Sequence, residues 1–437
     1  MARRKPLPQA LPVAIESLDE ELRGVAHTTV GEVTREVRLR NALPGETVVG
    51  RVLKRRRGLW LGNAQDPEVG AAARREAACE VFPRCGGCAL QHLSGQDQLN
   101  HKENELRAAL SGHAVQPRRW LPPGKGPQFG YRRKARVGVR VVGDQVFVGF
   151  REAFASRVVD MHACPALDPR LSALIGPLRA VVARLSVCRA VPQIELAAGD
   201  ARVAVVLRHL EPLQAEDVEH LASFAASRNV DLYTQAGGYD TVQPLPGRPA
   251  ALLSYSLPDF GLSLQFAAAE FTQVNPHINQ MLVRQAVDAL CGYQVVADLF
   301  CGIGNFSLAL ARRGASVHGF EASASSIARA RDNAARNSVV GEFEVYDLYG
   351  EAAGELPLPQ GTEALLLDPP RSGAGPHLQR WLAPTVQAVA YVSCNPVTFA
   401  ADAQVLQDAG FVLEYAGVFD MFPQTLHVET LGVFRRT

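Results

Sequence analysis

The 437-residue sequence has no run of eighteen apolar residues, and this absence excludes a helical membrane span. It also lacks an apolar stretch after its basic start, because prolines and then Glu16, Asp19 and Glu20 follow. That pattern excludes a secretory signal peptide and predicts a cytoplasmic protein. Thiols stay reduced there, so clustered members of the eight cysteines are expected to bind a metal rather than to form disulfides.

Net charge is nearly absent as well, since the total is +1, and by itself this predicts no polyanionic partner. The positive charge is nevertheless concentrated. Residues 1–60 hold 12 basic and 7 acidic side chains, and residues 118–158 hold 10 and 2. Charge alone supports two interpretations equally, a nucleic-acid contact surface and a solvated basic face.

The chain is too long for one ordinary hydrophobic core, and its pattern changes along its length. Short strands separated by turns in residues 13–62 are typical of a small closed barrel of the OB type, which often binds oligonucleotides. Residues 95–111 have a helical pattern, and strands are expected from 128 to about 265. We therefore predict an OB-like β-barrel in residues 1–67, a central α+β domain in residues 68–265 and a third domain in residues 266–437.

One strand of the central domain separates charge from apolar surface. Its period of two places Arg132, Lys134, Arg136 and Arg140 on one face, and Val137, Val139 and Val141 on the other. Hairpins are expected at Gly143-Asp144 and around Gly199-Asp200.

Strands and helices alternate from about residue 270, which predicts a doubly wound α/β domain with a parallel, Rossmann-like sheet. The expected strands are 295–299, 316–320, 364–367 and 389–392, and the expected helices are 306–313 and 325–336. In such a sheet, ligands bind at the carboxyl ends of the strands.

A cofactor pocket is expected at those strand ends. Asp298 ends the first strand, and Gly302 and Gly304 allow a tight turn close to a ligand. The position of a third glycine holds Ser307, which counts against a dinucleotide. Glu321 ends the next strand, where it can accept hydrogen bonds from ribose hydroxyls. The rigid turn Asp368-Pro369-Pro370 is similar to one that S-adenosylmethionine enzymes acting on bases place beside the reacting group.

Cys394 and Glu429 form a second constellation. Cys394 ends an apolar strand and precedes the polar turn Asn395-Pro396, and Glu429 lies among apolar neighbours. A thiolate added to carbon 6 of uracil makes carbon 5 nucleophilic, and a carboxylate then removes the proton from carbon 5. The alternatives are a small buried hydrophobe for Cys394 and a solvated strand carboxylate for Glu429.

The third constellation is Cys79, Cys85 and Cys88, with Cys164 far downstream. Three cysteines within ten residues and a distant fourth favour thiolate ligation of an iron–sulfur cluster, and a four-cysteine zinc site is the alternative. The remaining cysteines, Cys188, Cys291 and Cys301, are expected in the core.

Taken in order, these motifs resemble the bacterial RNA uracil-5-methyltransferases, and most closely the ribosomal RNA branch with an N-terminal TRAM domain and a [4Fe–4S] cluster. The resemblance covers nearly the whole chain. It rests on the four clustered cysteines and on five segments, which are Phe271 to Asn275, Asp298 to Asn305, Asp368 to Arg371, Ser393 to Pro396 and His427 to Thr430.

The resemblance implies a TRAM-type barrel, a central iron–sulfur domain and an S-adenosylmethionine-dependent catalytic domain. Cys394 would be the nucleophile and Glu429 the base, and the cluster held by the four cysteines would be structural. The implied cofactor contacts are Gln273, Phe300, Asn305, Glu321, Asp347 and Asp368.

The expected function is therefore methylation of carbon 5 of one uridine in 23S ribosomal RNA by a monomer, with the basic strand and the barrel holding phosphates. Three alternatives stay open, namely a tRNA uridine, an exocyclic amine, and a non-catalytic RNA-binding or ribosome-assembly protein. Two departures from the family pattern are Gln424, where histidine is common, and Ala401 before Asp402, where arginine is common. Both are expected to affect RNA contacts more than the chemistry.

Overall fold

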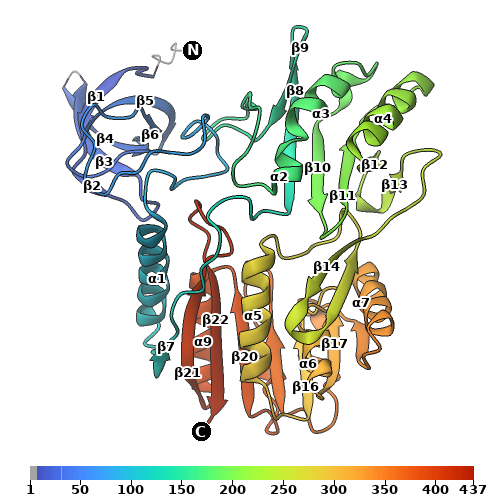
Figure 1. Cartoon of the computed structure of the whole chain (residues 1–437). Helices are drawn as coiled ribbons and strands as arrows, with labels where there is room; N and C mark the ends of the chain where they lie inside the picture. The colour runs from blue at the N-terminus through green and yellow to red at the C-terminus, as the bar shows by residue number, and fades with distance from the viewer. Residues whose placement is uncertain (1–6, 31) are drawn as a thin grey trace.

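The computed structural model describes residues 7–30 and 32–437, which form two six-stranded sheets, one eight-stranded sheet and a two-stranded hairpin (Figure 1). The N-terminal and central sheets lie above the C-terminal sheet in this view. Among the helices of the described residues, none has both the length and the apolar character needed to cross a bilayer.

The N-terminal sheet has the strand order β1-β5-β6-β4-β3-β2. Its strands pair antiparallel except for the parallel pair β4 and β6. Alternate apolar side chains, among them Val37, Leu39 and Val52, are buried and form its core. The six strands are β1 (Leu11–Ala14), β2 (Ser17–Leu18), β3 (Gly24–Val30), β4 (Val33–Arg40), β5 (Thr47–Arg56) and β6 (Leu59–Ala64).

The central sheet has the order β13-β12-β11-β10-β8-β9. Both expected hairpins are confirmed, β8–β9 across Gly143 and β10–β11 across Gly199. The predicted separation of charge is also confirmed, since Val137 and Val139 are buried while Arg136 and Arg140 are exposed. The strands are β8 (Lys134–Val142), β9 (Gln145–Gly149), β10 (Gln193–Ala198), β11 (Val203–Arg208), β12 (Asp231–Gln235) and β13 (Val242–Pro244).

Helices cover the valine face of the central sheet. Leu178 and Leu221 pack into the same core as Val137 and Ile194. This helical layer consists of α2 (Pro169–Ser172), α3 (Ile175–Val182) and α4 (Ala215–Arg228). The hairpin β14 (Leu253–Leu257) and β15 (Leu262–Phe266) follows and joins the core of the C-terminal sheet.

The C-terminal sheet has the order β18-β17-β16-β19-β20-β22-β21-β7. Its first five strands are parallel, which confirms the doubly wound α/β prediction, and β22 runs antiparallel to both β20 and β21. The strands are β16 (Val295–Leu299), β17 (Ser316–Glu321), β18 (Glu342–Val345), β19 (Ala364–Leu367), β20 (Ala388–Ser393), β21 (Phe411–Phe419), β22 (Glu429–Arg436) and β7 (Arg119–Trp120).

Helices cover both faces of this sheet. Side chains of α5 (Pro276–Ala289), α6 (Ser307–Arg312) and α7 (Ala324–Arg336) enter one core. Side chains of α1 (Gly95–Gly112), α8 (Leu378–Trp381) and α9 (Pro396–Asp408) enter the other. The expected helices 306–313 and 325–336 therefore correspond to α6 and α7.

A segment from early in the chain completes the C-terminal sheet. The helix α1 runs beside α9 and β21, and β7 pairs with the outer edge of β21 (Figure 1). The Lys102 ammonium on α1 lies 2.6 Å from the Asp420 carboxylate, and both side chains are fully buried. The helix predicted at 95–111 is thus attached to the C-terminal sheet, which its own pattern did not indicate.

Candidate functional site

A cavity of about 1020 Å³ opens at the carboxyl ends of the parallel strands. Those ends meet at one edge of the sheet, so residues far apart in sequence converge there. The cavity is lined by all eight side chains expected to act in catalysis or cofactor binding, namely Gln273, Phe300, Asn305, Glu321, Asp347, Asp368, Cys394 and Glu429.

Cys394 and Glu429 are brought together by strand register. Ser393, the last residue of β20, pairs with Thr430 of the antiparallel strand β22. One step further along the same register sets Cys394 beside Glu429, at the scale of about 5 Å between opposite Cα atoms. Glu429 is buried and Cys394 is half-buried, and both line the cavity. A thiol and a carboxyl group therefore face one space large enough for a planar base.

The acid–base state of this pair follows from burial and from neighbouring charge. Burial, followed by the negative charges of Glu429 and Asp368, raises the pKa of Cys394 to about 11, and Arg371 acts in the opposite direction. Burial and the Asp368 charge raise the pKa of Glu429 well above its usual range. The ligand-free site therefore favours a neutral thiol and a neutral carboxyl group.

Asn305 is held on two sides by residues that the sequence analysis did not single out. Its Oδ1 accepts hydrogen bonds from the Tyr255 hydroxyl at 2.8 Å and from Asn279 Nδ2 at 2.9 Å. Its Nδ2 donates to Asn279 Oδ1 at 2.9 Å. Tyr255 comes from β14 and Asn279 from α5, so only the folded chain reveals these contacts.

Aromatic rings form another part of the cavity. Phe300 has a φ of +69°, a left-handed conformation in the turn after β16, and its ring centroid lies 5.5 Å from that of Tyr349. The Tyr349 hydroxyl donates to the Gly373 carbonyl oxygen in the loop after β19. Asp347 accepts a hydrogen bond from the Tyr349 backbone at 3.0 Å. These rings are tilted by 41° to one another, and their apolar faces provide a stacking surface for a flat ligand.

Buried carboxyl groups surround the same turn. Ser307 donates to one oxygen of Asp298, while the other oxygen is buried and has no partner among the described residues. Gln273 Nε2 donates to Asp368 at 3.2 Å. Burial raises the pKa of both Asp298 and Asp368 to about 7. Such groups favour a cationic ligand, because a positive charge stabilises the carboxylate that burial disfavours.

Gln424 faces the interior of the protein. It is buried, and its backbone carbonyl accepts hydrogen bonds from Ala89 at 2.8 Å and Leu90 at 3.1 Å. Its side chain accepts from Gln98 at 2.9 Å and donates to Gln128 at 3.2 Å. The expectation that Gln424 affects RNA contacts is therefore wrong for a direct contact, because these partners occupy its side chain.

The four clustered cysteines lie close together in the central region. The thiols of Cys79, Cys85 and Cys164 each raise the pKa of Cys88, which burial brings to about 12. Within residues 7–30 and 32–437, no three His, Cys, Asp or Glu side chains are arranged as a metal-binding group. Of the three remaining cysteines, Cys301 is buried, Cys188 is half-buried and Cys291 is exposed, so the core assignment is wrong for Cys291.

The basic strand is only partly free to meet a ligand. Lys134 Nζ donates to the Glu270 carbonyl oxygen, and burial lowers the pKa of Lys134 to about 8. Arg136 Nη2 forms an ion pair with Glu195 at 2.9 Å. Lys134 is therefore an internal contact between the central sheet and the loop before α5. Arg140 is the exposed member of the set without a partner among the described residues.

Comparison with known proteins shows what the chain resembles. A family model described as tRNA (uracil-5-)-methyltransferase matches residues 255–351 and 360–437. The 23S rRNA (uracil(1939)-C(5))-methyltransferase RlmD of Nitrosococcus oceani is 43% identical over 448 residues, which cover 100% of this chain and 98% of the relative. The protein of the same name from Nitrosospira multiformis is 41% identical over 447 residues, covering 97% and 98%.

The fold is shared with a solved structure as well. The Pyrococcus abyssi tRNA (uracil-54, C5)-methyltransferase in complex with S-adenosyl-L-homocysteine superimposes with a TM-score of 0.73 at 23% identity, covering 97% of this chain and 100% of that one. The cavity at the strand ends and the full-length similarity agree. The chain therefore belongs to the RNA uracil-C5-methyltransferase family.

Proposed function

We propose that this protein methylates carbon 5 of a uridine in 23S ribosomal RNA, with S-adenosylmethionine as the methyl donor. The observation that carries the proposal is the register of β20 and β22, which pairs Ser393 with Thr430 and so sets a thiol beside a carboxyl group at the cavity wall. The relatives of nearly full length are named for that RNA. We propose that the protein acts in the cytoplasm as a monomer.

In this mechanism the Cys394 thiolate adds to carbon 6 of the uracil ring, and the electron pair of the 5,6 double bond moves toward carbon 5 and the carbonyl oxygen. S-adenosylmethionine supplies an electrophilic methyl group when bound. Glu429 then takes the proton from carbon 5, the double bond re-forms, and the Cys394 sulfur leaves as a thiolate. The full sequence of steps needs the sulfur for addition and the carboxylate for proton removal at the same ring, and the strand register supports this arrangement.

The raised pKa of Glu429 suits a base. A carboxylate whose protonated form is favoured by burial is a stronger proton acceptor than one in water. Glu429 must be ionised before it can accept a proton. A positive charge nearby, or a neutral Asp368, favours its ionised form. Either change also lowers the pKa of Cys394, because the negative charges of Glu429 and Asp368 raise that pKa.

Residues at the strand ends would hold the donor. We assign its contacts to Gln273, Phe300, Asn305, Glu321, Asp347 and Asp368, which line the cavity together. Phe300 and Tyr349 offer a stacking surface for a purine, and Glu321 ends β17, where a carboxylate can accept hydrogen bonds from ribose hydroxyls. Asp368 lines the cavity, and its raised pKa fits a ligand with positive charge.

The substitution Cys394→Ala tests the nucleophile. Turnover should fall below detection, because carbon 5 of uracil is a poor nucleophile without addition at carbon 6. The measurement is transfer of labelled methyl groups to RNA. Cys291→Ala, at an exposed thiol, is the matched control and should keep wild-type turnover. Methylation by Cys394→Ala would exclude the mechanism.

The substitution Glu429→Gln tests the base. Addition and methyl transfer should proceed, and the reaction should then stop before elimination, because no carboxylate takes the proton. We expect a protein–RNA adduct that survives denaturing electrophoresis and that disappears in the double variant Cys394→Ala/Glu429→Gln. Free RNA that carries the 5-methyl group in the Glu429→Gln reaction, with no adduct, would assign the base to another group.

The four cysteines are proposed to bind a [4Fe–4S] cluster. Their donor chemistry fits, since thiolates are the ligands of such clusters. Burial, with the neighbouring thiols adding to it, raises the pKa of Cys88 to about 12 and that of Cys164 to about 11, so these thiols need a positive centre to ionise. Arg40 supports the loop by donating to the carbonyl oxygens of Pro83 at 2.8 Å and Cys85 at 3.1 Å. Iron and sulfide analysis of anaerobically purified protein tests the assignment, and a colourless protein with zinc would support the zinc alternative.

The N-terminal sheet would act as the TRAM-type RNA-binding barrel of residues 1–67, followed by the central iron–sulfur domain of residues 68–265 and the catalytic domain of residues 266–437. Mass spectrometry of 23S rRNA and tRNA from cells lacking the protein identifies the substrate. Loss of 5-methyluridine from 23S rRNA alone is expected. Loss from tRNA alone would redirect the proposal to a tRNA uridine.

A further inference from the structure

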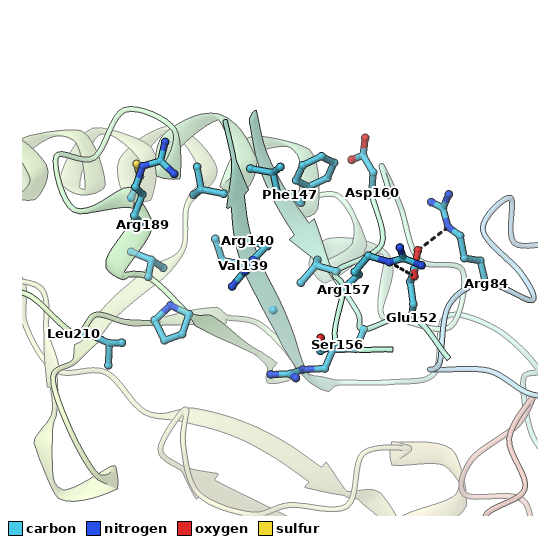
Figure 2. A pocket seen from close by; sticks show the side chains of 18 residues that line it. Arg84, Val139, Arg140, Phe147, Glu152, Ser156, Arg157, Asp160, Arg189 and Leu210 are labelled. Atoms are coloured by element: carbon cyan, nitrogen blue, oxygen red, sulfur yellow. Dashed lines mark hydrogen bonds and ion pairs between the residues drawn. The ribbon is translucent and has the colours of Figure 1, made fainter. Parts of the chain in front are cut away.

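A second cavity, of about 880 Å³, lies on the central sheet and contains neither Cys394 nor Glu429 (Figure 2). The β8–β9 hairpin, the loop 151–160 and the 3-10 turn Cys188–Ala190 form its walls. Its lining is rich in guanidinium groups, namely Arg84, Arg140, Arg151, Arg157 and Arg189.

Positive charge in this cavity exceeds what its carboxylates can neutralise. Glu152 lies 3.8 Å from Arg84 and 2.8 Å from Arg157, as the dashed lines of Figure 2 show. The other lining carboxylate, Asp160, forms an ion pair with Arg179, which is not in the lining.

The remaining guanidinium groups have no acidic partner. Arg140 and Arg151 are exposed, and no other side chain of the described residues forms a hydrogen bond or ion pair with either of them. Arg189 donates to the neutral Gly143 carbonyl oxygen. Arginine forks of this kind form strong, often bidentate bonds with phosphate oxygens.

The strand face that carries Arg140 connects the second cavity with the wall of the catalytic cavity. Arg136, Gly138 and Arg140 alternate on β8, so they share this face. Arg136 donates to the Tyr239 hydroxyl, and Tyr239 lines the catalytic cavity. Between the two arginines, Gly138 lets Val158 pack close to the strand, since a Cβ atom there would lie only 3.1 Å from a Val158 methyl group.

The neighbouring strands extend the same face. Arg208 of β11 lies opposite Gln193 of β10, which in turn pairs with Gly138. The Arg208 Nε atom is buried and has no hydrogen-bond partner among the described residues. Arg136 and Arg140 are four residues apart, about 13 Å along the strand. Guanidinium groups therefore extend from the wall of the catalytic cavity into the second cavity.

We propose that the second cavity binds the phosphodiester backbone of the substrate RNA on one side of the reacting uridine, a few nucleotides away, with Arg140 and Arg151 as its principal contacts. The inference rests on the proposed function, because that function places an RNA strand at Tyr239. It adds a phosphate site at a stated place, outside the cavity where the chemistry occurs.

The test is the double variant Arg140→Ala/Arg151→Ala. It is assayed on a transcribed 23S rRNA fragment that the wild type methylates. A second series of substrates shortens this fragment stepwise on either side of the uridine. KM for the long fragment should rise about tenfold and kcat should stay unchanged. The slope of log Kd against log salt should decrease by about two. Shortening one flank should abolish the difference between variant and wild type, and shortening the other should not.

The matched control is Arg184→Ala/Arg228→Ala, which removes two exposed arginines from the helical layer beyond the other face of the central sheet. It should leave KM and the salt slope at wild-type values. Equal losses in both double variants, or a loss that does not depend on either flank, would overturn the phosphate site. Arg140→Lys/Arg151→Lys keeps the charge and should retain most of the salt slope.

Two further outcomes separate this inference from its premise. Kd is measured without S-adenosylmethionine, so a protein that binds the fragment and methylates nothing would refute the proposed function while the salt slope still decides on the phosphate site. Inorganic phosphate is the second probe, by calorimetry. Phosphate binding that disappears in the Arg140→Ala/Arg151→Ala variant, with RNA affinity unchanged, would assign the cavity to a free anion and overturn the RNA site.

Discussion

At the scale of single residues, carboxyl groups shielded from water determine the protonation state in and around the active site. Asp298 and Glu429 are fully buried or nearly so and Asp368 is half-buried, and each has a pKa above its ordinary value, chiefly because of burial. Between the ordinary carboxyl pKa and about 7, Asp298 and Asp368 therefore hold more protons in the folded protein than in the unfolded chain. The stability that these two groups contribute is lost as pH rises through that window.

Binding of the donor should release protons near pH 7. A sulfonium charge lowers the pKa of Asp368 from about 7, so the affinity for S-adenosylmethionine should increase as pH rises from 6 to 8. Calorimetry in buffers of different ionisation enthalpy measures the protons released. S-adenosylhomocysteine, which lacks the positive charge, is the matched control ligand. Equal proton release by both ligands would show that the carboxyl groups do not respond to the sulfonium.

At the scale of elements, α1 anchors the loop that leads into β22 and Glu429. Lys102 pairs with Asp420 and also donates to the Phe422 carbonyl oxygen at 3.0 Å. One turn earlier, Gln98 accepts a hydrogen bond from the Gln424 backbone at 2.8 Å. These contacts hold residues 420–424, immediately before the strand that begins with Glu429. We therefore regard Lys102 and Gln98 as positioning residues for the base.

Lys102→Met should destabilise the protein by about 3 kcal/mol or more, because it leaves the Asp420 carboxylate buried without a partner. Arg107→Met, which removes an ion pair with Glu103 on the same helix and a guanidinium group 3.9 Å from the centre of the Trp120 ring, should cost about 1 kcal/mol or less. Urea unfolding monitored by fluorescence measures both. A Lys102→Met midpoint equal to that of Arg107→Met would mean that the pair does not secure the helix.

At the scale of the whole molecule, the cysteine-bearing segment and the catalytic loop are one hydrogen-bonded unit. Cys88 immediately precedes Ala89 and Leu90, whose backbone N–H groups both donate to the Gln424 carbonyl oxygen. Tyr131, just before β8, donates to the neighbouring Pro423 carbonyl oxygen at 2.9 Å. Binding of the proposed cluster should therefore order residues 79–92 and, through these hydrogen bonds, also the loop 420–428 before Glu429.

Removal of the cluster by anaerobic chelation should increase amide hydrogen exchange in residues 79–92 and also in residues 420–428. The N-terminal strands β3 and β4, which form their own core, serve as the internal reference and should keep their protection. Exchange that increases only in residues 79–92 would show that the hydrogen bonds to Gln424 do not transmit the change.

The sequence alone identified most of the site because its motifs lie at strand ends. Strands 295–299 and 364–367 were predicted at their observed bounds, and a parallel sheet gathers the residues that follow such strands at one edge. Strand ends indicated Glu321, Asp368 and Cys394, and the family resemblance added Gln273, Phe300, Asn305 and Asp347. All of these line one cavity with Glu429, although their individual roles stay predictions. Local periodicity was also sufficient to separate Arg136 and Arg140 from the buried valines of β8.

Only the tertiary structure decided which distant segments meet. The sequence pattern of the helix at 95–112 would be the same whether it packs on the central or the C-terminal sheet. Its buried Lys102 pairs with Asp420, which lies 318 residues away in the sequence. Gln424 was judged from its place beside the site, yet its partners come from other parts of the chain. Periodicity and turn residues report local geometry, whereas pairing of charges and of hydrogen bonds across the fold depends on long-range packing that no local pattern contains.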